Sequence, residues 1–598
     1  MPLPIEDYAI IGDTSTVALV GRDGSIDWLC LPRFDSPAAF AALLGDESHG
    51  RWLVGPLAPP GREGVSCARR YVGDSAVLES TYTTATGTVR VTDVMPVADH
   101  QADIVRRVEG VAGTVRMRHE WAVRLGYGSI RPWVHRLRHN DEQMISAVAG
   151  PDRLVLRGDR LPRAEGGVHV DEFDVAEGET LTFSLTWLPS HLELPDFAHL
   201  GHRMAETHRI SESWAQRSHY SGPHEEAVTR SLITLRLMTH SETGGIVAAP
   251  TTSLPEEFGG ERNWDYRFCW LRDAALTLGA LLRCGYRDEV QLWRHWLLRA
   301  VAGDPEDLQI MYAVDGGRDL PERTLEHLPG YAGSRPVRIG NGAVGQVQHD
   351  VVGEVMHALE LARGVGVPDD EDSWALQRAM VGHLATNWRE PDSGLWEIRG
   401  PARHFVQSKV LVWTAFDRAV RAVEEHGLPG PADEWRAVRD EVRAEILERG
   451  VDRERGTFTQ HYDTTEVDAS LLVLPKLGFI AGDDPLMLGT IRAIEEDLMD
   501  EGFLRRYRTQ TDVDGITGDE NPFLACSFWL VSAYVAAGRV DDARALMDRL
   551  VGLCNDVGLL SEEYDPRNER FAGTFPQAFS HLTLVDAAVD LAAVTAES

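Results

Sequence analysis

Two kinds of hydrophobic pattern divide the chain. From residue 1 to about 200, apolar and polar residues alternate in short runs that glycines and Pro-Gly clusters separate. The segment TVALVGRDGSIDWLCL (16–31) has two apolar runs around Asp-Gly, a strong hairpin signal. The segments GTVRVTDVMPV, GTVRMRHEWAVRL and EGETLTFSLTWL alternate in the same way. We therefore predict an antiparallel β-domain of the sandwich type over residues 1–200.

The period becomes helical after this domain. Residues 201–222 are polar and helical, and we expect them to form a linker. From 223 to 598, about twelve helices are expected, near 223–240, 270–284, 286–302, 344–364, 371–388, 404–426, 430–449, 467–476, 483–499, 521–537, 539–556 and 575–595.

These expected helices alternate in character. RDEVQLWRHWLLRAV and PADEWRAVRDEVRAEILERG have a charged face. LRDAALTLGALLRCG, SKVLVWTAFDRAV and NPFLACSFWLVSAYVAAG are apolar nearly all round and should be buried. The alternation predicts an inner and an outer layer, as in an α/α toroid; an irregular helical bundle is the alternative.

Polar and aromatic residues crowd the segments that precede the expected buried helices. Examples are GGERNWDYRFCWLRDA, DSGLWEIRGPARHF and LLSEEYDP. In a toroid such segments converge on a central hole, where a site should lie. Aromatic faces stack on sugar rings, and charged or amide groups bond sugar hydroxyls. The pattern therefore favours a sugar-binding site.

Two acidic segments have the chemistry for cleaving a glycoside. Glu397 follows Trp396, and a carboxyl held against an indole has a raised pKa and can act as a general acid. Glu562 and Glu563 are adjacent in an extended segment, so at most one of them can face the hole. From the local sequence alone, a surface acid and a solvated acidic turn remain the alternatives. An inverting hydrolase needs an acid and a base about 6.5–9.5 Å apart.

The composition excludes several other classes of partner. The net charge of -34 at pH 7 argues against nucleic acid and anionic membranes, and it suits a neutral substrate. No apolar run reaches about 18 residues, and the N-terminus lacks a signal-peptide pattern, so we expect no membrane span and a cytoplasmic location. The six cysteines include no CxxC pair and should be buried free thiols.

Motifs for other chemistries are absent from the sequence. There is no HExxH, GxSxG or G-x4-GK[ST], and the histidines lack zinc spacing. TQTDVDGITGDE (509–520) has the acids of a calcium loop but a misplaced glycine, so we expect a turn. We therefore expect no metal site. Lys409 and Lys476 are the only lysines, so Lys409 either serves a need for a compact ammonium or arises by chance.

Four segments resemble the bacterial glucoamylase and trehalase group of glycoside hydrolase family 15. They are RNWDYRFCWLRDA (262–274), DSGLWEIRGPARHFVQSKVLVWTAFDRAV (392–420), GLLSEEYDP (558–566) and FPQAFSHLTLV (575–585). IGDTSTVALVGRDGSIDWLCLPRFDSPAAF (11–40) is similar to the N-terminal β-domain signature of that group. The resemblance implies an N-terminal β-supersandwich, a linker and an (α/α)6 barrel over residues 223–598. It also implies exo-hydrolysis of α-glucosidic bonds with inversion and no cofactor.

The resemblance also assigns roles to individual residues. By motif position, Glu397 matches the general acid and Glu562 the general base, and Glu563 should point away into the packing of its loop or into solvent. The residues that match the wall gripping the terminal glucose are Tyr266, Trp270, Arg272 and Asp273. Asp273 would bond the glucose hydroxyls with Arg272 beside it, and Tyr266 resembles a tyrosine near the attacking water. Further substrate contacts are expected from Trp264, Asp265, Trp396 and Lys409.

One loop departs from the pattern of the group. Where the group usually has a Gly-Glu-Glu-Gly-Thr-Phe-like run, this chain has GDENPF (518–523). That sequence is closer to the Gly-Asn-Pro-Trp of fungal glucoamylases. The difference leaves the substrate preference open. We predict an inverting α-glucoside hydrolase that releases β-glucose from a nonreducing end of a small neutral glucoside, leaning to α,α-trehalase. The alternatives are a glucoamylase-type α-1,4/α-1,6-glucosidase, a disaccharide phosphorylase, which needs no second catalytic Glu, and a non-catalytic carbohydrate-binding protein.

Overall fold

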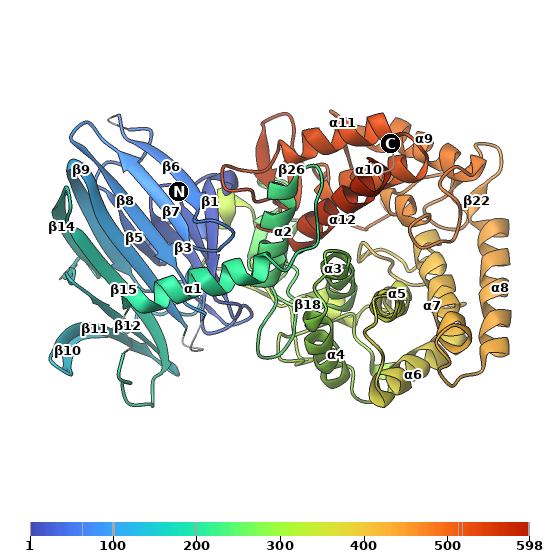
Figure 1. Ribbon diagram of the computed structural model, residues 1–598, viewed down its shortest axis with the longest axis horizontal. Coiled ribbons are helices and arrows are strands. Elements are labelled where there is room, and N and C mark those ends of the chain that lie inside the picture. The colour runs from blue at the N-terminus through green and yellow to red at the C-terminus, as the bar shows by residue number, and fades with distance from the viewer. Residues whose placement is uncertain are drawn as a thin grey trace.

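The protein consists of a β-domain and a helical domain that lie side by side (Figure 1). The computed structural model describes residues 2–62, 64–97, 102–197, 200–511, 513–516 and 518–595. The helix α1 (Leu200–Ala215) runs from the β-domain toward the helical domain. The strands of the β-domain end at Pro189, and the first barrel helix begins at Glu225.

The β-domain is an antiparallel assembly of 15 strands. Its strands are β1 (Tyr8–Gly12), β2 (Val17–Gly21), β3 (Ser25–Cys30), β4 (Ala38–Phe40), β5 (Arg51–Pro56), β6 (Ser66–Tyr71), β7 (Leu78–Thr83), β8 (Gly87–Val94), β9 (Asp103–Ala122), β10 (Trp133–His139), β11 (Glu142–Ala149), β12 (Asp152–Gly158), β13 (Arg163–Glu165), β14 (Val168–Ala176) and β15 (Thr180–Pro189). β2 and β3 form the hairpin that Asp-Gly predicts.

The long strand β9 joins the two sheets of this domain. Its first half pairs with β8 and β15, and its second half pairs with β5 and β14. Apolar positions of the strands meet in a core that includes Trp28, Trp52 and Trp121, all of them at most 1% exposed. Alternation along the strands therefore produced a two-sheet β-domain, as the sequence predicts.

The helical domain is a double ring. Its helices are α2 (Glu225–Leu237), α3 (Leu271–Arg283), α4 (Asp288–Ala300), α5 (Asp350–Gly364), α6 (Glu371–Asn387), α7 (Val406–Glu424), α8 (Ala432–Arg449), α9 (Pro485–Leu498), α10 (Leu524–Ala536), α11 (Val540–Val551) and α12 (Ala578–Thr595). Around the inner ring, α3 contacts α5, α5 contacts α7, α10 contacts α12, and α12 returns to α3. The 3-10 segment η7 (Ala469–Val473) closes the ring between α7 and α10. The (α/α)6 arrangement is thereby confirmed (Figure 1).

Burial follows the predicted inner and outer character of the helices. In α7, 15 of the 19 positions are buried, whereas α8 buries only Trp435, Val442 and Ile446 of its 18. One expectation is wrong: residues 467–476 do not form an α-helix but contain the short η7. The side chain of Asp468 caps its start, and Pro475 lacks the N–H that a longer helix would need.

The helix α12 has the length and mean hydropathy of a membrane span. However, 67% of it is buried inside the protein, and it packs against α2, α3 and α10. An inner helix of a double ring is covered on all sides, so an apolar sequence all round suits this position.

The β-domain also holds the segments that flank the second acidic motif. Asn555 donates from Nδ2 to the carbonyl oxygens of Glu6 and Tyr8, at 3.1 and 2.9 Å. Glu6 also forms an ion pair with Arg570 at 2.6 Å. Arg570 begins β27 (Arg570–Ala572), which pairs with β26 (Glu563–Asp565). The acidic pair thus lies on a hairpin that contacts both domains.

Candidate active site

A cavity lies where the inner helices begin. Its volume is about 740 Å³, including the part that is open to solvent. Trp270 and Phe523 on its wall directly precede α3 and α10, and Gln577 precedes α12. The sequence-predicted residues that line this cavity are Trp264, Tyr266, Trp270, Arg272, Asp273, Trp396, Glu397 and Glu562. The entry loops therefore converge as the toroid predicts.

Glu397 is held in place by its backbone and by its partners. Its φ of +57° is in the left-handed region, which costs a residue other than glycine about 1–3 kcal/mol. Trp270 donates from Nε1 to Glu397 Oε1 at 2.6 Å, and Arg272 Nη2 lies 3.6 Å from the same oxygen. Burial raises the pKa of Glu397, although Arg272 opposes the rise. The site therefore offers a fixed carboxyl with a raised pKa and with donors placed to stabilise its anion.

The indole beside Glu397 is not the expected one. The sequence suggested Trp396, but the hydrogen bond to Glu397 comes from Trp270. Trp396 lines the cavity and donates from Nε1 to both carboxylate oxygens of Asp468 at 3.0 Å. Adjacent residues in a turn point in different directions, so the neighbour in sequence is not the neighbour in space.

Arg272 and Asp273 form a buried pair in the first turn of α3. Arg272 Nε donates to Asp273 Oδ2 at 3.0 Å, and Arg272 Nη1 donates to the carbonyl oxygen of Leu395 at 2.8 Å. Arg272 thus connects α3 with the loop that carries Glu397. Because both side chains line the cavity, they can bond the hydroxyls of a sugar in pairs.

Glu562 presents one bonded and one free oxygen. Thr574 donates to Oε2 from its backbone nitrogen at 2.9 Å and from its hydroxyl at 3.0 Å. Oε1 has no hydrogen-bond partner, and the residue is 1% exposed. Burial, with a smaller contribution from Glu256, raises the pKa of Glu562 to about 8. Glu562 therefore lines the cavity with one carboxylate oxygen whose capacity to accept a hydrogen bond is unused.

Glu563 is turned away from the cavity, but it does not reach solvent. It is 0% exposed and is absent from the cavity wall, whereas Glu562 is part of that wall. Its Oε2 accepts a hydrogen bond from the backbone nitrogen of Asn521 at 3.1 Å. The geometry agrees with the expected division between the adjacent acids, and of the two expected surroundings of Glu563 it shows packing and not solvent.

Tyr266 lies among the carboxyls of the cavity. Its ring meets the Trp270 ring edge-on, with centroids 5.3 Å apart. Burial raises its pKa well above 10, and the charges of Glu562, Glu256 and Glu397 raise it further. The hydroxyl therefore stays neutral and is able both to donate and to accept a hydrogen bond.

The structure does not bring Asp265 and Lys409 to the cavity. Asp265 accepts two hydrogen bonds from Arg267, at 2.8 and 2.6 Å, and is completely buried. Lys409 is 1% exposed and donates to the carbonyl oxygens of Trp388 and Glu390. The polar atoms of both residues are used within the protein, so the geometry does not support their expected substrate contacts, which stay predictions.

Several residues of the cavity wall were not found from the sequence: Glu256, Arg262, Asn341, Arg399, Arg506, Tyr507, Asp514, Gln577 and Phe579. One of them, Arg506, binds both Glu256 and Glu520. The available signal was the arginine cluster LRRYR that precedes the GDENPF loop.

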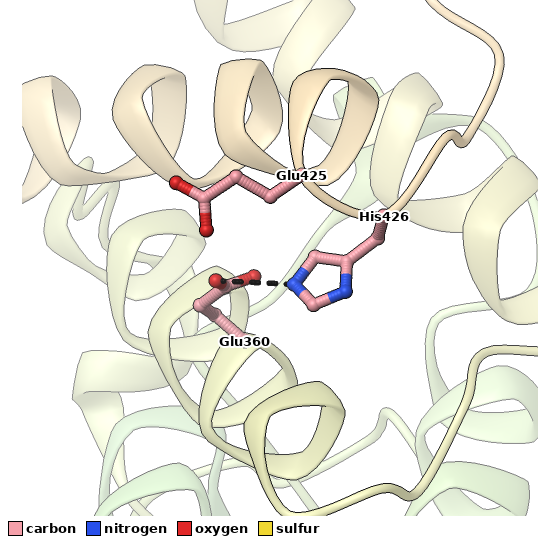
Figure 2. Close-up of side chains that lie close together, drawn as sticks. All are labelled: Glu360, Glu425 and His426. Atoms are coloured by element: carbon pink, nitrogen blue, oxygen red, sulfur yellow. Dashed lines mark ion pairs between the residues drawn. The ribbon is translucent and has the colours of Figure 1, made fainter.

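Two groups of side chains have the spacing of metal ligands within the described part of the chain. The first is Glu360, Glu425 and His426 (Figure 2), where Arg421 lies 3.3 Å from Glu360 Oε1 and 3.0 Å from Glu425 Oε1. The second contains three glutamates that Arg506 contacts. In both groups a guanidinium already supplies the positive charge, so neither donor set fits a metal ion without displacing an arginine.

Comparison with known proteins agrees with this geometry. Residues 222–589 match the family model of glycosyl hydrolases family 15, and residues 1–161 match the trehalase-like N-terminal domain. The chain is 36% identical to the trehalase of Mycobacterium tuberculosis, over 98% of this chain and 89% of that protein. It is 33% identical to the trehalase of Thermoplasma volcanium, over 98% of this chain and 93% of that protein.

A solved structure shares the whole fold. The crystal structure of a bacterial glucoamylase complexed with acarbose superimposes with a TM-score of 0.72, over 99% of this chain and 95% of that one, at 11% identity. The resemblance seen in the sequence motifs is thereby confirmed along nearly the entire chain. The protein belongs to glycosyl hydrolases family 15 and is a glycoside hydrolase.

Proposed function

We propose that the protein is an inverting α,α-trehalase in which Glu397 is the general acid and Glu562 the general base. The observation that carries the proposal is the placement of these two carboxyls, from separate loops, on the wall of one cavity. The choice of trehalose is supported by the relatives that bear the name trehalase.

The acid step uses the surroundings of Glu397. Burial raises the pKa of this carboxyl, which favours the protonated form that donates its proton to the glycosidic oxygen as the bond to the anomeric carbon breaks. The carboxylate that remains is stabilised by the Trp270 N–H at 2.6 Å and by the Arg272 guanidinium at 3.6 Å. The leaving glucose departs as a neutral hydroxyl compound.

The base step uses the free oxygen of Glu562. In its ionised form, Glu562 takes a proton through Oε1 from a water molecule that attacks the anomeric carbon from the far side of the ring. Thr574 keeps its two hydrogen bonds to Oε2 and fixes the orientation of the carboxylate. The attack inverts the anomeric configuration and gives β-glucose.

The substrate would be held by neutral and paired groups. Arg272 and Asp273 offer complementary donors and acceptors for the hydroxyls of the terminal glucose, and the rings of Trp270 and Tyr266 cover its apolar surface. Such a wall fits a small neutral glucoside.

A substrate panel with product analysis tests the proposal. The protein is incubated with trehalose, maltose, isomaltose and soluble starch, and NMR follows the anomers that first appear. We expect trehalose to be the best substrate and to release one β-glucose for each α-glucose. Turnover of maltose or starch far above that of trehalose would instead indicate a glucoamylase-type enzyme, as the GDENPF loop leaves open.

Two other outcomes would overturn hydrolysis itself. Formation of glucose 1-phosphate in the presence of phosphate would indicate a disaccharide phosphorylase. Binding of sugars without turnover would indicate a carbohydrate-binding protein, and Glu397→Gln would then leave binding intact.

We also propose a reducing, cytoplasmic location, supported by the six cysteines, which are all free thiols in the structure. Fractionation of the source cells, with detection of the protein by antibody, tests this location. Recovery of the protein outside the cytoplasm would overturn it.

A further inference from the structure

A cluster of buried acids extends from Glu256 on the cavity wall to Glu520 and Glu563, which do not line the cavity. One carboxylate oxygen from each of Glu256, Glu520 and Glu563 lies within 4.8 Å of the other two. All three residues are at most 3% exposed. Glu562 adjoins Glu563 in the chain and is only 1% exposed, so four nearly inaccessible carboxyls interact with one another.

The positive charge in this region does not balance four carboxylates. Arg506 binds Glu256 at 2.9 Å and Glu520 at 3.1 Å, and its Nη2 lies 3.8 Å from Glu563 Oε1. Arg262 lies 3.6 Å from Glu520, but it also serves Asp514 at 2.7 Å. An excess of buried negative charge is costly, so the cluster retains at least one proton.

Glu256 and Glu520 each accept two hydrogen bonds that stabilise their ionised forms. Glu256 Oε1 accepts from Trp264 Nε1 at 3.0 Å, and its Oε2 accepts from Arg506. Both oxygens of Glu520 accept from Arg506. Charge-assisted bonds of this kind favour the carboxylate form, so neither acid is the best place for the proton.

Glu562 and Glu563 differ in the number of hydrogen bonds that their carboxyls accept. Glu562 accepts two hydrogen bonds from Thr574. Glu563 accepts a single one, from the backbone of Asn521, and its Oε1 has no hydrogen-bond partner although it is buried. Of the four carboxyls, Glu563 is therefore the least stabilised as an anion.

We propose that Glu563 is a positioning residue that retains the proton of this cluster, so that Glu562 is the member of the pair that ionises. The proposal rests on the proposed function of Glu562 as a base. The groups that face Glu563 from the surrounding elements are Glu256, Glu520, Arg506, Glu562 and Cys526. The proton on Glu563 removes one negative charge beside Glu562, whose ionised form accepts the proton of the attacking water.

The direction of the pKa values agrees with this order. Burial and the neighbouring Glu256 and Glu520 raise the pKa of Glu563 well above its usual range, whereas Glu562 is raised to about 8. The pair is also fixed in the backbone, because the backbone nitrogen of Leu524 donates to the Glu562 carbonyl oxygen at 3.0 Å. This bond holds the backbone beside Glu563 and does not involve the charge of either side chain.

Infrared difference spectroscopy of the whole protein tests the proposal without measuring activity. Spectra of wild type, Glu563→Gln and Glu562→Gln are compared at a pH about one unit above the pKa of about 8 given to Glu562. We expect Glu563→Gln to remove a carboxylic-acid C=O band and Glu562→Gln to remove carboxylate bands. The reverse assignment would overturn the proposal, whether or not the protein hydrolyses trehalose.

Two further variants keep the test decisive. Glu520→Gln is the matched control, since Glu520 accepts from Arg506 through both oxygens and should lose carboxylate bands. Glu563→Asp replaces Glu563→Gln where the amide does not fold, and it should shift the acid band rather than abolish it. An acid band that is lost only in Glu520→Gln would place the proton on Glu520 and refute the proposal.

The pH dependence of kcat/KM adds a readout that a merely structural role would not change. The neutral amide introduced by Glu563→Gln mimics a protonated Glu563, so the pH at which activity rises should be the same in this variant and in wild type. If Glu563 were the ionised member, the substitution would remove a like charge and lower that pH by about one unit or more. Such a decrease would overturn the proposal.

Discussion

The two carboxyls on the cavity wall lie in opposite electrostatic surroundings. Glu397 is next to an indole N–H and a guanidinium, whereas Glu562 is next to other acids. In the proposed reaction Glu397 loses a proton and becomes an anion, which Arg272 and Trp270 stabilise. Glu562 gains a proton and becomes neutral, which relieves the repulsion around it. Each environment therefore favours the state that its own residue reaches during the reaction.

The backbones of the two residues differ as well. Glu397 sits in a loop with a left-handed φ of +57°, and side-chain partners hold it. Glu562 precedes a hairpin whose opposite side is packed so closely that Gly573 leaves no room beside it. Hydrogen bonds hold both carboxyls, but only Glu562 is also confined by the close approach of a backbone, at Gly573. The difference predicts which substitutions disturb each residue.

The largest effect is expected from removing the acid. Glu397→Gln should lower kcat on trehalose by about 10²–10⁴-fold, because an amide cannot donate the proton that the leaving oxygen needs. Steady-state kinetics measure the loss, and thermal unfolding checks the fold. Glucosyl fluoride is the control substrate, because fluoride leaves without a proton.

Activity on the fluoride separates the two carboxyls. It should be largely retained in Glu397→Gln and lost in Glu562→Gln, since the base is still needed to activate water. Equal losses on both substrates in Glu397→Gln would show that Glu397 is not the acid.

A smaller loss is expected from crowding the base. In Gly573→Ala the new Cβ would lie 2.6 Å from Glu562 Oε2, and φ is +70°. Displacing a catalytic group by about 1 Å costs roughly 100-fold in rate, so kcat should fall by about that factor. The matched control is Gly427→Ala, where φ is +69° and nothing lies within 4 Å. Equal kcat values for the two variants would contradict a role for close packing in placing Glu562.

The sequence predicts most of the fold because burial leaves a local pattern. The inner α7 and the outer α8 differ in their apolar periodicity, and the structure places them accordingly. The segment 467–476 fails because capping by Asp468 and the nearby Pro475 shorten it, although its apolar pattern is that of an inner helix.

The candidate site is predicted less completely, for two physical reasons. Trp264 and Tyr266 line the cavity, whereas Asp265 does not. Successive side chains of an extended segment point to opposite sides, and these three residues follow that alternation. The same reasoning that separates Glu562 from Glu563 would have excluded Asp265. Arg506 reaches the cavity from a loop far along the chain, and no local pattern records such a contact.

The repulsion around Glu562 also predicts how stability depends on pH. Its pKa is about 8 in the folded protein and about 4.3 when unfolded. The folded state therefore binds more protons between these values, and stability falls as pH rises through this window. At the upper end of this pH window, the free energy of unfolding of Glu562→Gln should exceed that of wild type by about 1–2 kcal/mol. The gain is no larger because the neighbouring acids take up part of the charge. Denaturant unfolding at both ends of the pH window measures the difference in stability between the variant and wild type. An equal gain in stability at the two pH values would refute the raised pKa of Glu562.

The smallest effect is expected at Lys409. This residue lies in α7 and belongs to the surroundings of neither Glu397 nor Glu562. Its ammonium bonds the carbonyl oxygens of Trp388 and Glu390 at the end of α6, while burial lowers its pKa. Lys409→Met loses these bonds but also removes a buried charge, so we expect a net destabilisation of about 1 kcal/mol. Thermal unfolding should show this decrease, and kcat and KM should stay at the wild-type values because Lys409 does not line the cavity. A rise in KM with an unchanged melting temperature would instead restore Lys409 as a substrate contact.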